Sequence, residues 1–389
     1  MTLAYCTNIW SHHQGPVCRE FAKLLGDGFR MFVFQPLDCV WSKERQAMGW
    51  NLIPPNEPWI VGPPKTTKEL SDNFFQGWIE SADVLVYGEN HYFDHEALLR
   101  RLKYGKLSFK MGERLLKSQI RWYQWLSPFF IRRWLITHNS FNYPSLHYLS
   151  MSHWCSRDLH FFHVCKGRIW RWGYLTEVSK TPTEKTERGK VNVGWCGRML
   201  DWKNVDYILR AIALLPQSIR AHMELTLVGE GPEEERLKQL AEIFGLSDCV
   251  WFRPFLPQKE AMSFMSSLDV FVFPSGRKEG WGAILPEAMD KSCAVIANEA
   301  AGSTLELVRD GVNGFTFKNG DIKTLACRLS QLIVDGQLRK KMGQRAWRTM
   351  QEWSPSVGAY RFVALANTLL SGEHQHCPNC LRGLCELEG

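Results

Sequence analysis

Long hydrophobic runs are missing from this chain of 389 residues. No apolar stretch reaches the roughly 18 residues that a membrane-spanning helix needs. The first residues, Met1 to Cys6, lack the charged segment and apolar core of a secretory signal, so we expect a cytoplasmic protein. Solenoid-length repeats are also absent. The composition, with 45% hydrophobic and 22% charged residues, excludes disordered, collagen-like and coiled-coil classes.

The cysteine pattern lacks the regular pairing of a disulfide framework. Twelve Cys are scattered, mostly singly, among apolar residues, which predicts buried and reduced thiols. The exception is the C-terminal stretch 372–389, where Cys377, Cys380 and Cys385 stand near two His residues. Such a set can supply four zinc ligands, although its spacing matches no known finger. We favour a loose, reduced tail and expect no metal.

Net positive charge is absent from the second half of the chain. Residues 181–389 hold 25 basic and 25 acidic residues, whereas residues 1–180 hold 22 basic and 15 acidic ones and so carry the whole net charge of +7. Residues 100–133 contain ten basic residues, one acid and many aromatics. This pattern is typical of a segment that docks on an anionic membrane. The alternative is a solvated charged face over buried aromatics; nucleic acid is not expected because no binding motif accompanies the charge.

Short apolar runs alternate with helical stretches along the chain. We expect strands at residues 3–6, 31–34, 83–88, 107–111, 147–150, 168–172, 191–196, 223–228, 250–252, 270–273 and 294–297. This alternation implies parallel sheets with helices on both faces. The predicted fold class is therefore α/β, with two doubly wound Rossmann-like domains that hold ligands at the carboxyl ends of their strands.

A polar stretch separates the two halves. Residues 181–190 (TPTEKTERGK) lack large apolar side chains and contain Pro182, which is typical of an interdomain linker. The expected domains are therefore residues 1–180 and 191–352.

Two carboxylates eight positions apart form the strongest local motif. Glu279 and Glu287 enclose small residues in the sequence EGWGAILPE. A helix that opens at Ala283 would point its amide and that of Ile284 toward a diphosphate. The carboxylates suit vicinal hydroxyls of a sugar and a ribose, while helix capping and surface charge are the alternative. Close approach of a ligand to the backbone is allowed by Gly280 and Gly282.

Six segments in one order carry a wider pattern. They are Gly197-Arg198 with Lys203, Val228 to Pro232, Phe273 to Ser275, Glu279 to Glu287, Ala297 to Gly302, and Asp310 to Gly314. Together they make residues 191–335 resemble the donor-binding domain of retaining family 4 glycosyltransferases with the GT-B architecture, in which two domains face each other across a cleft. The family usually has Phe in place of Trp281 and a hydrophobic residue in place of Pro286; neither change removes a polar ligand group.

The resemblance implies a role for each matched residue. Arg198 and Lys203 would neutralise the donor diphosphate, whose charge grows as the glycosidic bond breaks, without a divalent metal. Glu279 would contact the donor sugar and Glu287 the ribose. Further donor contacts would come from Gly197, Gly229, Val250, Phe252, Gly280, Gly282, Ala283 and Ile284. The helix at about 354–371 would cross back to the first domain.

The first domain matches the family less closely. The loop after its first strand has one Gly instead of several, and His13 and Gln14 occupy the place where acceptor and donor phosphate would meet. The stretch 110–114 (KMGER), with residues 150–158 and 172–174, resembles the acceptor domains of bacterial surface-polysaccharide glycosyltransferases. Glu113 would either pair with Arg114 or face the acceptor hydroxyl. The acceptor-side residues are thus His13, Gln14, Glu113 and Arg114, and His13 and Glu113 are also candidates for catalysis, with structural roles as the alternative.

The sequence therefore predicts a retaining, metal-independent hexosyltransferase without a cofactor. It would move a sugar from a UDP- or GDP-sugar to a glycan or lipid-linked acceptor in surface polysaccharide or glycoconjugate synthesis. Residues 100–133 would dock the acceptor domain on the inner face of the membrane. The alternatives are a nucleotide-sugar epimerase or hydrolase of the same fold, or a catalytically silent scaffold on the membrane.

Overall fold

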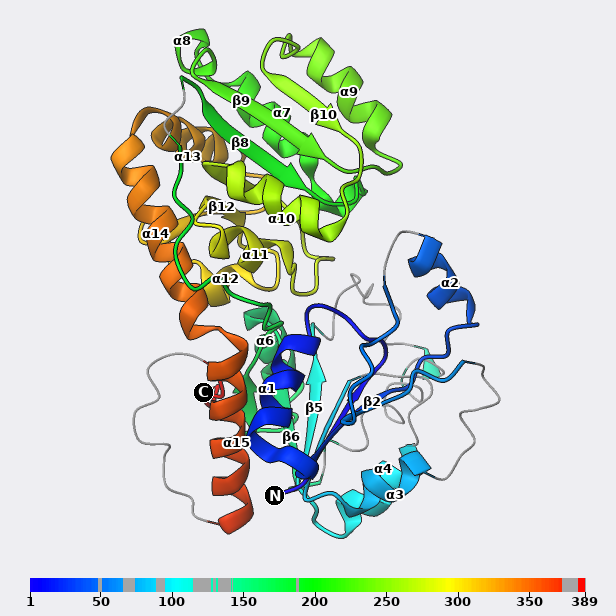
Figure 1. Cartoon of the computed structure of the whole chain (residues 1–389). Helices are drawn as coiled ribbons and strands as arrows, with labels where there is room; N and C mark the ends of the chain where they lie inside the picture. Colours follow the sequence, from blue (N-terminus) through cyan, green and yellow to red (C-terminus); the bar gives the residue numbers. More distant parts are fainter. Residues whose placement is uncertain are drawn as a thin grey trace. The chain divides into compact units, whose positions relative to one another are not determined.

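The chain divides into two compact units in the computed structural model. The first unit comprises residues 1–177 and 353–389 and the second residues 178–352. The structure describes residues 1–47, 51–65, 74–88, 95–114, 127–128, 131, 141, 143–186, 189–372 and 384–388. Each unit contains one twisted sheet with helices packed on it (Figure 1). The units are described separately below.

The first unit is built on a parallel sheet of seven strands in the order β3-β2-β1-β4-β5-β6-β7. Strands β2 and β3 lie on one side of β1, and β4 and the later strands lie on its other side. The strand order therefore reverses between β1 and β4, and ligands of such folds bind at this switch point. The strands are β1 Leu3–Thr7, β2 Phe29–Val33, β3 Ile60–Val61, β4 Val84–Tyr87, β5 Ser108–Gly112, β6 Leu146–Ser150 and β7 Ile169–Arg171. The helices include α1 Gly15–Leu25, α2 Val40–Ala47, α3 Phe74–Ser81, α4 His95–Lys103, α6 His153–Phe161 and α15 Pro355–Ser371.

The second unit repeats this topology with six parallel strands in the order β10-β9-β8-β11-β12-β13. The predicted fold class, two doubly wound α/β domains, is confirmed. The strands are β8 Val191–Cys196, β9 Met223–Val228, β10 Val250–Arg253, β11 Val270–Phe273, β12 Ala294–Asn298 and β13 Gly314–Phe317. The helices are α7 Val205–Ala213, α8 Gln217–Arg220, α9 Glu234–Ile243, α10 Gln258–Ser267, α11 Ile284–Asp290, α12 Thr304–Leu307, α13 Ile322–Val334 and α14 Gly336–Glu352.

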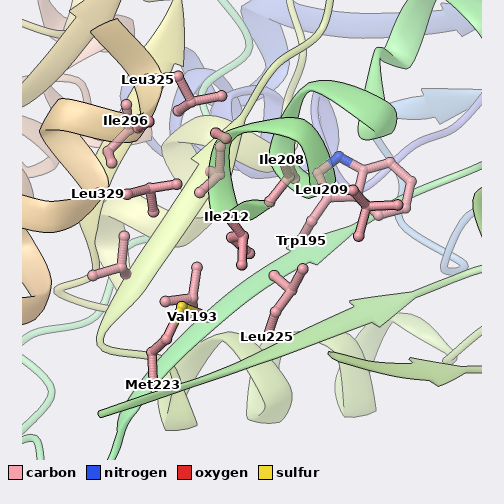
Figure 2. Packing of buried hydrophobic residues seen from close by; sticks show 14 of the residues in the cluster. Val193, Trp195, Ile208, Leu209, Ile212, Met223, Leu225, Ile296, Leu325 and Leu329 are labelled. Carbon is pink, nitrogen blue, oxygen red and sulfur yellow. The ribbon is translucent and has the colours of Figure 1, made fainter. Parts of the chain in front are cut away.

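The core of the second unit lies between its sheet and α7. Val193 and Trp195 of β8 are fully buried and face Ile208 and Ile212 of α7 (Figure 2). Apolar residues four positions apart lie on one helical face, and alternate residues of a strand share one sheet face. These two periods explain why this helix and this strand pack together.

The last long helix, α15, belongs to the core of the first unit. The ring of Phe362 packs edge-on against Phe109 of β5 at 5.0 Å between centroids and against Phe21 of α1 at 5.4 Å. Gly358 makes this packing possible, since a Cβ there would lie 2.2 Å from Leu175 Cδ1. The helix is therefore held by buried aromatic contacts.

Residues 384–388 form a short clasp on the edge strand β7, which differs from the loose tail expected for residues 372–389. The amide of Glu388 donates to Ile169 O at 2.8 Å, and Leu387 forms an antiparallel bridge with Trp170. Arg171 pairs with Glu388 at 3.2 Å and with a second clasp carboxylate, Glu386. Cys385 is buried within the clasp, whereas Cys377 and Cys380 lie outside the described residues.

The polar stretch expected as a linker lies along the second unit where the structure describes it. The amide of Thr183 donates to Ser292 Oγ at 3.0 Å, and Lys185 Nζ donates to Ser266 O at 3.1 Å. The boundary between the units falls earlier, after Glu177.

Candidate active site

Two loops at the carboxyl edge of the second sheet touch through glycines. A Cβ on Gly229, after β9, would lie 1.8 Å from Gly197 O, and one on Gly231 would lie 2.4 Å from Met199 O. Both residues also have positive φ angles, of 131° and 156°. No side chain fits at either place, so the glycines bring the loop that carries Arg198 against the end of β9. The Arg198 side chain is exposed at this edge.

Lys203 and Glu279 form an ion pair at the same edge. Their side chains are 18% and 14% exposed, so the contact is largely shielded from water. Lys203 ends a 3₁₀ turn, Asp201–Lys203. This turn is bound to the loop after β11, because the amide of Gly276 donates to Trp202 O at 2.7 Å. The two residues that the resemblance assigns to phosphate and sugar thus contact each other.

Helix α11 begins one residue later than the sequence suggested. Its first residue is Ile284, and Ala283 is the N-cap. In the described part of the chain, the amides of Gly282, Ala283 and Ile284 donate no hydrogen bond. The loop before the helix is tightly packed, because a Cβ on Gly282 would lie 2.3 Å from the Phe273 ring and one on Gly302 would lie 1.6 Å from the Gly280 carbonyl oxygen. Backbone N–H groups at a helix start favour an anion.

Glu287 lies on α11 and is 7% exposed. Its charge acts on Cys196 at the end of β8: burial, with a smaller contribution from Glu287 and against the opposing effect of Lys203, raises the pKa of the Cys196 thiol to about 12. Cys196 therefore stays a neutral thiol. Glu287, Lys203 and Glu279 surround the end of β8.

Three buried hydroxyls near these loops were not singled out from the sequence. Ser275 Oγ, Ser303 Oγ and Thr304 Oγ1 have no hydrogen-bond partner among the described residues. Buried hydroxyls usually have a hydrogen-bond partner. These three hydroxyls lie beside the candidate site, which makes them candidate ligand-binding groups. The only sequence signal was their place within or next to the matched segments around Pro274 and Gly302.

The residues predicted to line a base lie on β10, at the edge of the sheet. Val250 is buried and Phe252 is half-buried. The strand is joined to the loop of Gly229, whose amide donates to Arg253 O at 3.0 Å. Val250, however, is the first residue of β10 and packs in the core, away from the carboxyl ends of the strands, so its predicted contact with the base is not supported.

The acceptor-side residues lie at the corresponding edge of the first sheet. Gln14 Oε1 accepts a hydrogen bond from Thr7 Oγ1 at the end of β1. Glu113 Oε1 accepts one from Tyr174 OH at 3.1 Å. Within the described residues, Arg114 pairs with Asp158 at 3.6 Å and not with Glu113, so the expected Glu113–Arg114 ion pair is wrong.

Half of the described positive charge in residues 100–133 is buried. Of its six described basic residues, Arg101, Lys110 and Arg114 are only 1%, 4% and 9% exposed. The Arg101 guanidinium donates to four backbone carbonyls and to Ser108 Oγ. The expectation that this whole stretch faces lipid is therefore wrong for these three residues. The remaining basic residues beyond Arg114 lie outside the described part of the chain.

Comparison with known proteins finds glycosyltransferases both for the sequence of the second unit and for the fold. Residues 181–349 match the family described as Glycosyl transferases group 1. The fold is that of the GT-B glycosyltransferases. HepE of Anabaena, solved with UDP, has a TM-score of 0.67 and 18% identity over 95% of this chain and 100% of that chain. The lipopolysaccharide outer core galactosyltransferase WaaB has a TM-score of 0.67 and 14% identity over 95% and 99% of the two chains.

Curated relatives match over the second half of the chain. An uncharacterized glycosyltransferase of Methanocaldococcus jannaschii is 29% identical over 179 residues, 45% of each chain. The lipopolysaccharide core biosynthesis glycosyltransferase LpsE of Rhizobium meliloti is 29% identical over 174 residues, 45% of this chain and 47% of that protein. The match therefore spans just under half the length of these relatives.

Among the described helices, none has the length and apolar character required to cross a bilayer.

Proposed function

We propose that the protein is a retaining glycosyltransferase of family 4. It would transfer a hexosyl group from a UDP- or GDP-sugar to a glycan or lipid-linked acceptor in surface polysaccharide synthesis. The observation that carries the proposal is the convergence of Arg198, Lys203, Glu279 and Glu287 at the carboxyl edge of the second sheet, in the part of the chain that matches the glycosyltransferase family.

The donor diphosphate would lie between the cations and the start of α11. As the bond from the sugar to the phosphate breaks, negative charge grows on the leaving nucleoside diphosphate. Arg198 is exposed at this edge, and Lys203 would transfer part of its interaction from Glu279 to the phosphate. Fixed cations and the amides of Ala283 and Ile284 stabilise this charge without reorganising, which lowers the barrier. A divalent metal is therefore not required for this step.

The carboxylates suit the two polyol parts of the donor. Each carboxylate has two acceptor oxygens, which match vicinal hydroxyls. Glu279 would bind the sugar and the buried Glu287 the ribose, with Phe252 beside the base. Neither carboxylate is needed as a hydrolytic acid or base of the kind that glycosidases use. Attack on the face that the diphosphate leaves, with a phosphate oxygen taking the proton of the acceptor hydroxyl, would retain the anomeric configuration.

Named relatives support an acceptor of the glycan type. LpsE is named for lipopolysaccharide core biosynthesis, which supports a glycan acceptor. HepE was also solved with UDP-glucose, which supports a UDP-sugar donor. A different match, the 2-deoxystreptamine N-acetyl-D-glucosaminyltransferase of Streptomyces fradiae, is 32% identical over 158 residues. The relatives differ in the sugars that their names give, so the donor sugar of this chain is to be identified by the following screen.

The test is a screen of labelled UDP- and GDP-sugars against alkyl glycosides, with EDTA present and absent. We expect one donor to raise the melting temperature, because a ligand that binds only the folded state stabilises it by RT ln(1 + [L]/Kd). Formation of a new glycoside with retained configuration, undiminished by EDTA, supports the proposal. An epimerised or hydrolysed donor without a glycoside contradicts it. Arg198→Ala should abolish most transfer, whereas Arg210→Ala, which changes an exposed arginine paired with Asp206, should not.

A further inference from the structure

Three side chains from distant parts of the chain meet at the carboxyl edge of the first sheet. His13 follows β1, Glu113 follows β5 and Tyr174 follows β7. Strand β4 lies between β1 and β5, and β6 lies between β5 and β7. The three side chains therefore gather over strands that do not carry them, as ligand-binding groups do at this edge of α/β sheets.

Tyr174 joins the other two residues. Its hydroxyl donates to Glu113 Oε1 at 3.1 Å. Its ring stacks on the His13 ring, with 5.3 Å between centroids and 28° between planes. All three side chains are half-buried, so they are held in place and still reach the surface of the unit.

The backbone under these residues is fixed by short contacts. The amide of Met151 donates to Gly112 O at 3.0 Å, next to Glu113. The amide of Trp172 donates to Ser150 O at 2.8 Å, two residues before Tyr174. A Cβ on Gly112 would lie 2.3 Å from Tyr148 OH, so this strand end passes close to its neighbour. A site on such rigid strand ends can orient a ligand group accurately.

Among the residues that the structure describes, the charges next to these three side chains balance. Arg114 and Asp158 form an ion pair whose side chains are 6% and 7% exposed. Lys110 is also buried, with its ammonium 5.0 Å from the centroid of the Phe141 ring. Two cations thus accompany Glu113 and Asp158. The surroundings favour an uncharged ligand over a phosphate-bearing one, although the whole segment is basic.

The geometry points to a subsite in which His13, Glu113 and Tyr174 bind and orient a hydroxyl of a neutral sugar acceptor. A carboxylate can accept from Tyr174 and from a sugar hydroxyl together, because its two oxygens offer about four lone-pair positions. The Tyr174 oxygen, while donating to Glu113, can still accept, and the imidazole of His13 supplies a donor or an acceptor. This inference rests on the proposed function and assigns its acceptor class. The residues orient the hydroxyl; no covalent bond to them is involved.

The experiment compares Glu113→Gln and Tyr174→Phe with the wild type, using the donor selected in the screen above. The acceptor probes are neutral octyl glycosides and, in parallel, glucose 6-phosphate. Glu57→Gln and Tyr104→Phe are matched controls, because both residues are exposed. Each variant is first checked for its melting temperature and for its affinity for UDP and GDP.

We expect both variants to lose about tenfold or more in kcat/KM for the neutral glycoside, since removing a group bound to a substrate hydroxyl costs more than about 1.4 kcal/mol. Affinity for the nucleotide should be unchanged, and the controls should match the wild type. Wild-type preference for glucose 6-phosphate over the glycosides would overturn the neutral class. Unchanged transfer by a folded Tyr174→Phe protein, or equal loss of nucleotide binding, would overturn the subsite. A wild type that neither binds a nucleotide nor transfers a sugar would instead reject the proposed function.

Discussion

Lys203 and Glu279 are bound to each other at the edge where the donor is proposed to lie. The sequence resemblance assigns the lysine to a phosphate and the carboxylate to a sugar. The ion pair positions both side chains at the end of β8. Each side chain can exchange part of this interaction for a contact with the donor. The two residues therefore should not act independently in transfer.

We expect Lys203→Met and Glu279→Gln each to lower kcat/KM for the donor by about 100-fold, because each removes a fixed polar group that stabilises the transition state. The double variant should lose less than the product of the single effects, since residues in contact are energetically coupled. Lys278→Met is the control: Lys278 is 56% exposed and pairs with an exposed aspartate. Steady-state kinetics of the wild type, the two single variants and the double variant measure the coupling, and multiplicative effects would show that the pair has no functional link.

Gly302 and Gly229 should tolerate no side chain. An added Cβ would lie 1.6 Å from Gly280 O in the first case and 1.8 Å from Gly197 O in the second. A clash with backbone cannot be relieved by turning a side chain. We expect each Ala variant to lose about 1–3 kcal/mol in the free energy of unfolding and to bind nucleotide weakly. Urea denaturation should leave Gly336→Ala near the wild type, because the nearest atom there, Arg339 Nη2, is 3.5 Å away; similar losses in all three would refute the packing argument.

The fold could be predicted because most strands of a doubly wound sheet are buried on both faces. Continuous apolar runs such as Leu3–Thr7 and Val270–Phe273 indicate strands directly. Two strands were missed for physical reasons. β3 has two residues, Ile60–Val61, which is too short for any periodicity, and β13 begins at Gly314 and contains a half-buried threonine. Their places in the sheets come from pairing with β2 and β12.

The two sides of the candidate site were predicted unequally well. On the donor side, the key residues lie in short segments with fixed spacing, so Glu279 and Glu287 could be found together. On the acceptor side, Glu113 and Tyr174 are 61 residues apart and meet across an intervening strand. A local pattern cannot show such a contact. The same reason hid Asp158 as the partner of Arg114.

Stability of the first unit should fall as the pH drops below about 6.5, the ordinary pKa of histidine. Burial lowers the pKa of His147 to about 4, with Arg168 adding to the effect. Trp170 Nε1 donates to His147 Nδ1 at 2.9 Å, which requires the neutral ring. Between these pH values the unfolded chain binds a proton that the folded chain does not. The free energy of unfolding therefore falls toward low pH by up to about 1.4 kcal/mol per pH unit.

Urea denaturation at several pH values between 7 and about 4 isolates this contribution. His147→Gln keeps an acceptor for Trp170 and should show a smaller loss of stability toward low pH than the wild type. His222→Gln, at an exposed position, should retain the wild-type slope. Equal slopes for His147→Gln and the wild type would refute the assignment.

Membrane association, expected from the sequence for residues 100–133, should depend only on the basic residues that reach the surface. Lys103 is exposed, unlike Lys110. We expect sedimentation with anionic vesicles at low salt and release at high salt, because surface attraction is screened by ions. Lys103→Glu should weaken binding by about fivefold or more, as each surface cation contributes about 1 kcal/mol. Absence of binding at low salt, or an equal effect of Lys166→Glu at another exposed position, would contradict docking through this segment.

Arg101 should matter for folding and not for membrane binding. Its side chain is 1% exposed and its guanidinium donates to buried carbonyls of Ile79, Ala82, Asp83 and Leu107. Arg101→Met would remove this donor from all four carbonyls, of which Leu107 O also accepts from the Leu85 amide; each buried group left unsatisfied costs about 1–3 kcal/mol. We expect a loss of about 3–5 kcal/mol in the free energy of unfolding. Arg100→Met removes a neighbouring cation whose side chain is 48% exposed and pairs with Glu80, so its loss should be below about 1 kcal/mol. If both variants were equally stable, the buried cation would not be the anchor that joins α4 to the strand ends around it.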